Sequence, residues 1–217
     1  EGLDLEDPAN EPDLDKDKFL EMSVSPYKAP DAATEVSVDF EAGVPVAVNG
    51  EKMKVSQIIA KLNELGGANG IGILDIVENR LIGMKDHGIY ETPGGTILYF
   101  AHEQLEMLTL DKETAHMKSK LAVDYADLIY NGKWFSPLAE ALTAFAKKAN
   151  ENCTGTVKLK LYKGNMINAG ITSPNSLYSE ELVTFGESDF DQAQAAGFIN
   201  IWGLPTKVQS LLKSGKL

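Results

Sequence analysis

The grouping of apolar patterns along the chain is the feature that most constrains its fold. Val36, Val38 and Phe40 alternate with polar residues, which is the two-residue spacing of a strand with one buried face. The alternation resumes over 44–48 after a short break, so we expect an antiparallel hairpin. A second hairpin is expected over 156–171, with its turn at 163–165.

Helical spacing covers the segments between and after these hairpins. After the first hairpin, apolar residues recur every three or four positions: Val55, Ile58, Ile59, Leu62 and Leu65. We expect Gly66-Gly67 to end that helix and the mostly apolar run 71–77 to form a buried strand.

Cap signals place the later helices. We predict helices over 96–108, over 112–130 with Asp111 as N-cap, and from Pro137 with Ser136 as N-cap. Two more are expected in the tail, at 190–196 and 205–212. Strands in hairpins and helices in runs indicate an α+β fold, with antiparallel hairpins packed against helices, rather than repeated βαβ units.

Composition excludes several functional classes. Hydrophobic residues make up 43% of the 217 residues and no run is long enough for a membrane span, so we expect no membrane partner. The net charge of −12 argues against a nucleic-acid partner, because phosphate contacts need clustered Lys and Arg. Cys153 is the single cysteine, which fits a reducing, cytoplasmic setting and excludes a multi-cysteine zinc site.

Histidine and acidic residues do not predict a metal site. His87, His102 and His116 lack the HExxH spacing, and we expect them to be surface or hydrogen-bonded residues. Residues 1–35 contain eleven acidic residues against three lysines, and we expect an extended acidic connector rather than a set of metal ligands. The chain starts at Glu1 without Met or a signal-peptide pattern, so a fragment or a processed product is expected.

The glycines of 66–72 match a dinucleotide-binding spacing, G-x-x-x-G-x-G. That loop needs a strand before the glycines and a helix after them, because the pyrophosphate binds at the helix N-terminus. The expected order here is the reverse, a helix followed by a strand. The segment is therefore interpreted as a helix end and turn.

The segment 75–96 contains polar residues suited to a small zwitterion. Glu78, Arg80, Lys85 and Tyr90 could converge, since a carboxylate accepts ammonium or ureido N–H groups and a phenol bridges polar atoms. The alternative is an ordinary loop in which Glu78 pairs with Arg80 or Lys85. The residue pattern alone leaves both readings open.

Residues 76–96 resemble the argininosuccinate synthase family, whose string is I-V-E-N-R-x-x-G-x-K-x-x-G-x-Y-E-T-P-x-G-T. Further matches follow in family order at 5–8, 108–113, 134–137, 159–165, 173–178 and 197–199. The resemblance implies a cytoplasmic ligase of arginine biosynthesis and the urea cycle. Such an enzyme joins citrulline to aspartate through a citrullyl-adenylate, uses ATP with Mg²⁺, and releases AMP and pyrophosphate. It also implies a homo-oligomer, a tetramer in the family.

Carried over by position, Glu78 and Tyr90 match the family's citrulline-binding glutamate and tyrosine. The family's S-G-G-x-D-[ST] loop is absent from this sequence, so ATP, Mg²⁺ and aspartate are expected to bind mainly outside it. We therefore expect no catalytic, cofactor-binding or metal-binding residue here, and no activity of this chain alone. We also expect Glu78 and Tyr90 to lie close together on an exposed concave face.

The resemblance also suggests domain limits and two departures. We predict a connector at 1–35, a synthetase domain at 36–203 and an oligomerisation helix at 204–217, where Val208, Leu211 and Leu212 form an apolar edge. The family commonly has Ser-Arg at the position of Asp86-His87, and often a basic residue where Ile171 stands. A non-catalytic amino-acid-binding or assembly module of the same fold remains the alternative function.

Overall fold

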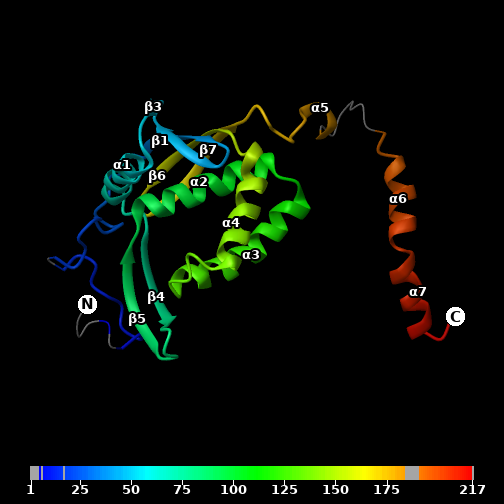
Figure 1. Cartoon of the computed structure of the whole chain (residues 1–217), viewed down its shortest axis with the longest axis horizontal. Helices are drawn as coiled ribbons and strands as arrows, with labels where there is room; N and C mark the ends of the chain where they lie inside the picture. Colours follow the sequence, from blue (N-terminus) through cyan, green and yellow to red (C-terminus); the bar gives the residue numbers. More distant parts are fainter. Residues whose placement is uncertain (1–4, 6, 17, 184–190, 217) are drawn as a thin grey trace. The chain divides into compact units, whose positions relative to one another are not determined.

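The described part of the chain combines a five-stranded sheet, a two-stranded ribbon and several helices (Figure 1). This computed structural model describes residues 5, 7–16, 18–183 and 191–216. It divides into two compact units, Glu1–Leu177 and Tyr178–Leu217, which are described separately below. Neighbouring strands pair antiparallel in both sheets, so the predicted α+β class is confirmed.

The five-stranded sheet has the order β3-β2-β1-β6-β7. Its strands are β1 (Thr34–Glu41), β2 (Val44–Val48), β3 (Glu51–Lys52), β6 (Gly155–Tyr162) and β7 (Asn165–Thr172). Both predicted hairpins are present, as β1–β2 and β6–β7. The two hairpins join through β1 and β6, with Val36 opposite Leu159 and Val38 opposite Val157.

One face of this sheet is covered by α1 (Val55–Ala68) and α2 (Pro93–Thr109) (Figure 1). The buried core between them includes Val38, Ile58, Leu62, Ile97, Leu105, Val157 and Leu161. Burial of each such side chain favours folding by about 1.5–3 kcal/mol. Ile171 packs against the same core from β7, so this position holds an apolar side chain rather than a charge.

Gly66 and Gly67 do not end α1, which continues to Ala68, so the predicted helix end is wrong. Both glycines are needed for close packing instead. A Cβ added to Gly67 would lie 2.2 Å from the Met22 carbonyl oxygen, and one on Gly66 would lie 2.8 Å from Cβ of Pro93. These contacts come from residues distant in sequence, so the helix keeps its glycines despite their cost in a helix interior.

The predicted caps of the next two helices are confirmed. In α3 (Lys112–Tyr130), the Asp111 side chain accepts the backbone N–H of Thr114, and in α4 (Pro137–Ala149) Ser136 accepts that of Ala139. A short 3₁₀ turn, η2 (Asn150–Asn152), follows. By contrast, α2 begins at Pro93, three residues before the predicted start at 96. Proline suits the first helical position, because its fixed φ matches the helix and the N–H it lacks would have no partner in the helix.

A strand is present near the predicted segment 71–77, but the prediction that it is buried is wrong. It is β4 (Ile73–Asn79), paired only with β5 (Lys85–Glu91) in a two-stranded ribbon outside the main sheet (Figure 1). Leu74 and Val77 are each 51% exposed. An apolar β-branched run does not by itself distinguish a core strand from an exposed ribbon.

The acidic N-terminal segment belongs to the first unit, and its described residues pack against the rest of that unit. Residues 7–16 and 18–33 form turns and bends, and we call the described residues between 5 and 33 the arm. Leu5, Ser25 and Ala29 are buried, and Val24 N–H donates to the Gly67 carbonyl at 3.0 Å. The functional limits 1–35, 36–203 and 204–217 stay predictions; residues 34 and 35 already belong to β1.

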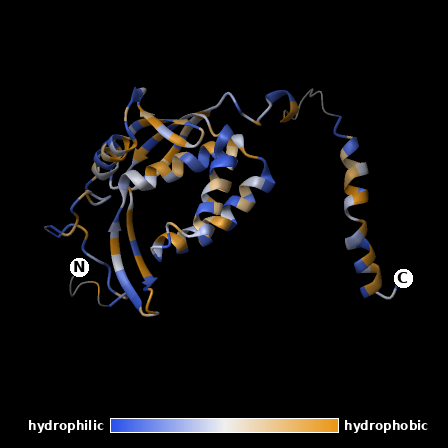
Figure 2. Cartoon of the chain, in the orientation of Figure 1, coloured by the Kyte–Doolittle hydropathy of each residue, from blue (hydrophilic) through white to orange (hydrophobic). Residues whose placement is uncertain are grey.

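The second unit contains α5 (Glu180–Val183), α6 (Gln194–Trp202) and α7 (Leu204–Lys213). The helix predicted at 190–196 begins at Gln194 instead, and residue 190 lies outside the described residues. Apolar segments alternate with polar ones along α6 and α7 (Figure 2). None of the helices in the described residues is long and apolar enough to cross a membrane.

A pair of glycine substitutions tests the packing at Gly67. We expect Gly67→Ala to destabilise the fold by about 1–3 kcal/mol, because the new methyl would overlap the Met22 carbonyl. Gly95→Ala is the matched control: nothing lies within 4 Å of its added Cβ, so stability should stay the same or rise by up to about 1 kcal/mol. Thermal unfolding followed by circular dichroism measures both. Equal effects of the two substitutions would contradict this account.

Candidate functional site

The β4–β5 ribbon presents two faces of different character. Because side chains alternate along a strand, residues 74, 76 and 78 share one face with 86, 88 and 90, which lie opposite them in the register. We call this the even face. Residues 73, 75, 77 and 79 lie on the odd face with 85, 87, 89 and 91.

Glu78 and Tyr90 meet on the even face. The Tyr90 hydroxyl donates a hydrogen bond of 2.6 Å to Oε1 of Glu78. This bond runs diagonally across the ribbon, since Glu78 lies opposite Asp86 and Tyr90 lies opposite Leu74. The predicted proximity of the two side chains is therefore confirmed, while their role in citrulline binding stays a prediction.

The absence of a side chain at Gly88 leaves room for the Tyr90 ring to reach Glu78. It lies between Asp86 and Tyr90 on the even face, and a Cβ added there would be 3.2 Å from Cε2 of Tyr90. The ring therefore rests on the backbone at Gly88. This ring contact depends on the β4–β5 register, which the sequence motif alone does not specify.

Arg80 and Lys85 do not join Glu78. Nη2 of Arg80 lies 2.6 Å from Oδ2 of Asp86, and this hydrogen bond raises the pKa of Arg80, with smaller contributions from the charge of Glu78. Lys85 lies at the end of the odd face. The alternative reading, in which Glu78 pairs with Arg80 or Lys85, is not what the structure shows either, and the four-residue cluster reduces to the Glu78–Tyr90 pair.

Hydrogen bonding to Glu78 also acts on the phenol itself. Together with burial, it raises the pKa of Tyr90 above its ordinary value of 10.0. The phenol therefore stays protonated near neutral pH and remains a donor. Tyr90 is 41% exposed, so the pair is accessible from solvent on this face.

Part of the odd face contacts the arm. Nε2 of His87 lies 2.6 Å from Oδ1 of Asp75, and its Nδ1 lies 2.9 Å from the Leu5 carbonyl. The Asp75 hydrogen bond raises the pKa of His87, which favours the imidazolium that can donate to both acceptors. The Glu91 carboxylate accepts two backbone N–H groups of the arm, from Glu21 and Met22.

The glycine segments do not fit a nucleotide phosphate site. The 66–72 segment forms the end of helix α1 and the turn before strand β4, so a helix precedes a strand there, as the sequence predicts. Gly94-Gly95 does follow a strand and open a helix, which the sequence reading did not anticipate. The N–H of Gly94 donates to Oδ1 of Asn63 at 2.8 Å, and a Cβ there would lie 2.8 Å from the Ile59 carbonyl oxygen. Gly94 therefore packs α2 against α1, whereas nothing lies within 4 Å of a Cβ added to Gly95.

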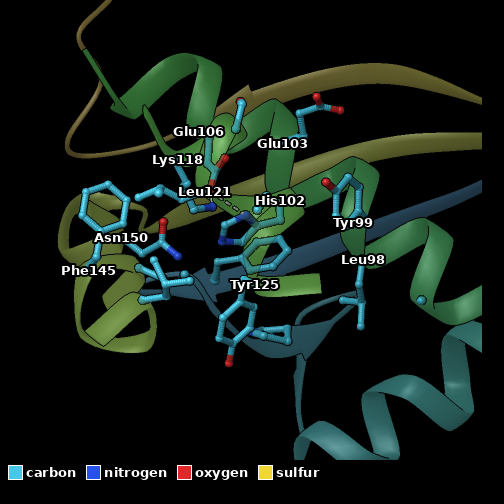
Figure 3. A pocket seen from close by; sticks show the side chains of 18 of the residues that line it. Leu98, Tyr99, His102, Glu103, Glu106, Lys118, Leu121, Tyr125, Phe145 and Asn150 are labelled. Atoms are coloured by element: carbon cyan, nitrogen blue, oxygen red, sulfur yellow. Dashed lines mark hydrogen bonds and ion pairs between the residues drawn. The ribbon is translucent and has the colours of Figure 1, made fainter. Parts of the chain in front are cut away.

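A separate cavity of about 600 Å³ lies among α2, α3, α4 and the β1–β2 hairpin (Figure 3). Its walls are mostly apolar, and three of its polar side chains, those of His102, Glu106 and Lys118, meet at one place in them. Nδ1 of His102 lies 3.0 Å from Oε1 of Glu106, and Lys118 of α3 pairs with the same oxygen. The i,i+4 spacing of His102 and Glu106 was the available sequence signal for this cluster.

Glu106 is a partly buried carboxylate held between two nitrogen donors, with its side chain 17% exposed. Burial alone would raise the pKa of Glu106, but hydrogen bonds from His102 and Lys118 outweigh it and the pKa lies below its ordinary 4.5. The cluster thus links α2 to α3. His116 is exposed on α3, and no group of three His, Cys, Asp or Glu within the described residues could hold a metal ion.

Comparisons with known proteins point to one family. A family model described as "Arginosuccinate synthase C-terminal domain" matches residues 1–209. Argininosuccinate synthase of Clostridium botulinum (strain Alaska E43 / Type E3) is 58% identical over 222 residues, which covers 100% of this chain and 54% of that protein. The protein of the same name from Desulforamulus reducens is 56% identical over 214 residues, covering 98% of this chain and 53% of that protein. The chain spans about half the length of these relatives.

The Glu106 cluster makes a prediction about stability and pH. Because the folded-state pKa of Glu106 is lowered, its contribution is complete above the ordinary value of 4.5 and is lost as pH falls through the folded value. We expect Glu106→Gln to lower stability by about 1–3 kcal/mol near neutral pH, with the difference shrinking as pH falls below the ordinary value of 4.5. Urea unfolding across this range measures it. The exposed Glu103→Gln on the same helix is the control, and a similar loss there would contradict the prediction.

Proposed function

Since the chain belongs to the argininosuccinate synthase family and matches its C-terminal domain, we propose that the complete protein is a carbon–nitrogen ligase of arginine biosynthesis. Its substrates would be citrulline, aspartate and ATP. The citrulline ureido oxygen would attack the α-phosphorus and release pyrophosphate, and the aspartate amine would then displace AMP. The contribution proposed for this chain is to bind citrulline.

The Glu78–Tyr90 hydrogen bond is the observation that carries this proposal. Citrulline offers an α-ammonium group and ureido N–H groups, which a carboxylate accepts. Tyr90 donates to Oε1 of Glu78, so it fixes the carboxylate and leaves the remaining acceptor positions for a ligand. The Tyr90 oxygen can itself accept a hydrogen bond.

ATP and Mg²⁺ are proposed to bind mainly residues outside this sequence. The glycine segment 66–72 and Gly94 are used in packing, as described above, and do not fit a phosphate-binding loop. No step of nucleotide chemistry is therefore assigned to a residue of this chain. The chain by itself is proposed to be inactive.

Substitution of Glu78 tests the proposed citrulline site. In the complete protein we expect Glu78→Gln to raise the citrulline KM, or lower kcat, by about tenfold or more, because a charge-assisted hydrogen bond is lost. Tyr90→Phe should give a smaller change in the same direction. Steady-state pyrophosphate release measures both. Glu64→Gln on α1 is the control, and citrulline kinetics unchanged by Glu78→Gln would remove Glu78 from the site.

We also propose that the protein is a cytoplasmic homotetramer and that the second unit supplies part of the contact. On α7, Val208 is 45% and Leu212 is 61% exposed, and on α6 Ile201 is 73% and Trp202 is 76% exposed. Exposed apolar side chains at helical spacing are typical of a face that another chain covers. Val208, Leu211 and Leu212 were predicted for this role.

Sedimentation velocity of the complete protein tests the assembly. We expect Leu212→Asp to shift the population toward smaller species, because a charge would be placed in an apolar contact. Gln209→Asp on the same helix is the matched control and should leave the tetramer intact. A tetramer that persists in Leu212→Asp, or a wild-type monomer at high concentration, would contradict the proposal.

A further inference from the structure

His87 of β5 joins the ribbon to the arm through both of its ring nitrogens. Nε2 lies 2.6 Å from Oδ1 of Asp75 on β4, and Nδ1 lies 2.9 Å from the Leu5 carbonyl oxygen. A carboxylate and a carbonyl oxygen are both acceptors, so each of these bonds needs a proton on the histidine nitrogen. A neutral imidazole has only one N–H, whereas an imidazolium has two. The complete arrangement therefore requires the protonated ring.

Water has little access to the junction of His87 and Leu5. The His87 side chain is 8% exposed and Leu5 is 7% exposed, whereas the Asp75 side chain is 46% exposed. If the ring lost one proton, the remaining N–H would stay on Nε2, because a charged acceptor binds it more strongly than a carbonyl does. The Nδ1 lone pair would then face the Leu5 carbonyl oxygen, and two buried acceptors without a proton between them are costly. Deprotonation therefore breaks the bond to the arm first.

Two carboxylates act on the His87 ring, and both favour its protonation. Asp75 on β4 acts through its hydrogen bond and its charge, and Asp86, the preceding residue on β5, acts through its charge. The Leu5 carbonyl of the arm also favours the imidazolium. Burial opposes these effects but is outweighed, so the pKa of His87 lies above its ordinary value of 6.5.

The arm has a second attachment to the ribbon, which does not involve a histidine. The Glu91 carboxylate accepts two backbone N–H groups of the arm, those of residues 21 and 22. Lys85, the other charged residue on the odd face of β5, lies at the opposite end of that strand. The two attachments therefore hold different parts of the arm: Glu91 holds residues 21 and 22, and His87 holds Leu5.

We propose that His87 is a pH-sensitive attachment point for the arm: its imidazolium holds the Leu5 end on the ribbon, and loss of the proton releases that end while Glu91 keeps the later part in place. Because the pKa is raised in the attached state, the contribution is complete below the ordinary value of 6.5 and is lost as pH rises through the raised value. This role concerns the arm itself and goes beyond the proposed function, so it is tested without citrulline.

Hydrogen–deuterium exchange of the complete protein, from about pH 6 to about pH 9, tests this attachment. The exchange of residues 7–16, corrected at each pH for the rate of an unstructured peptide, should rise by about threefold to fivefold with pH, the range of a partly exposed ion pair. The segment at residues 21–24, which is held by Glu91 and by the bond from Val24 to Gly67, is the internal reference and should show no such rise.

Two substitutions of His87 separate protonation from simple packing. His87→Arg introduces a permanent cation with several donors, so exchange of residues 7–16 should stay low across the whole range. His87→Gln has no cationic form, so exchange should already be raised at the low end. If wild type and His87→Arg show the same pH dependence, or if His87→Gln is as protected as wild type at low pH, the proposal is overturned.

Asp75→Asn provides a test that keeps the histidine in place. Loss of the Asp75 charge removes the strongest influence that favours the imidazolium, so the rise in exchange should begin at a lower pH than in wild type. Glu64→Gln on α1 is the control and should leave the pH dependence unchanged. A rise at the same pH in Asp75→Asn and wild type would contradict the proposal.

Discussion

Close backbone contact at the glycine segment 66–72 is the constraint on which the first unit depends. A Cβ on Gly67 would meet the Met22 carbonyl oxygen at 2.2 Å, and one on Gly72 would meet the backbone of Pro93 at 2.7 Å. The arm, α1, the start of β4 and the start of α2 therefore come together at backbone distance. A pattern that resembles a nucleotide loop in sequence serves here to pack four segments together.

The ribbon extends from this junction and depends on it. Thr92 N–H donates to the Gly72 carbonyl at 2.9 Å, which closes the ribbon at its base. A two-stranded ribbon is only marginally stable in water. The arm supplies further support through contacts with part of the odd face, where the Glu91 carboxylate accepts backbone N–H groups of the arm and His87 hydrogen-bonds to the Leu5 carbonyl. The acidic segment is thus part of the scaffold of the even face.

Local patterns in the sequence predicted what local interactions determine. Both hairpins of the main sheet and the caps at Asp111 and Ser136 follow from neighbouring residues. The predicted end of α1 was wrong because Gly66 and Gly67 are needed for close contacts with Pro93 and Met22, which are distant in sequence. The exposure of β4 was not predicted because the apolar pattern of a strand does not show whether it pairs within the main sheet or, as here, with β5 alone in a ribbon. Glu78 and Tyr90 were found through a family string, whereas the Arg80–Asp86 pair requires the register.

The hydrogen bonds to Asp86 and Glu78 on the even face differ in the charge of their donors. Arg80 is a permanent cation, so its bond to Asp86 compensates that carboxylate's charge. Tyr90 is a neutral donor, because its pKa is raised and the phenol stays protonated. Its bond therefore orients Glu78 without cancelling the negative charge. Of two carboxylates directly opposite each other, only Glu78 keeps a charge that a ligand's ammonium or ureido group could use, and the difference lies in the partner each one has.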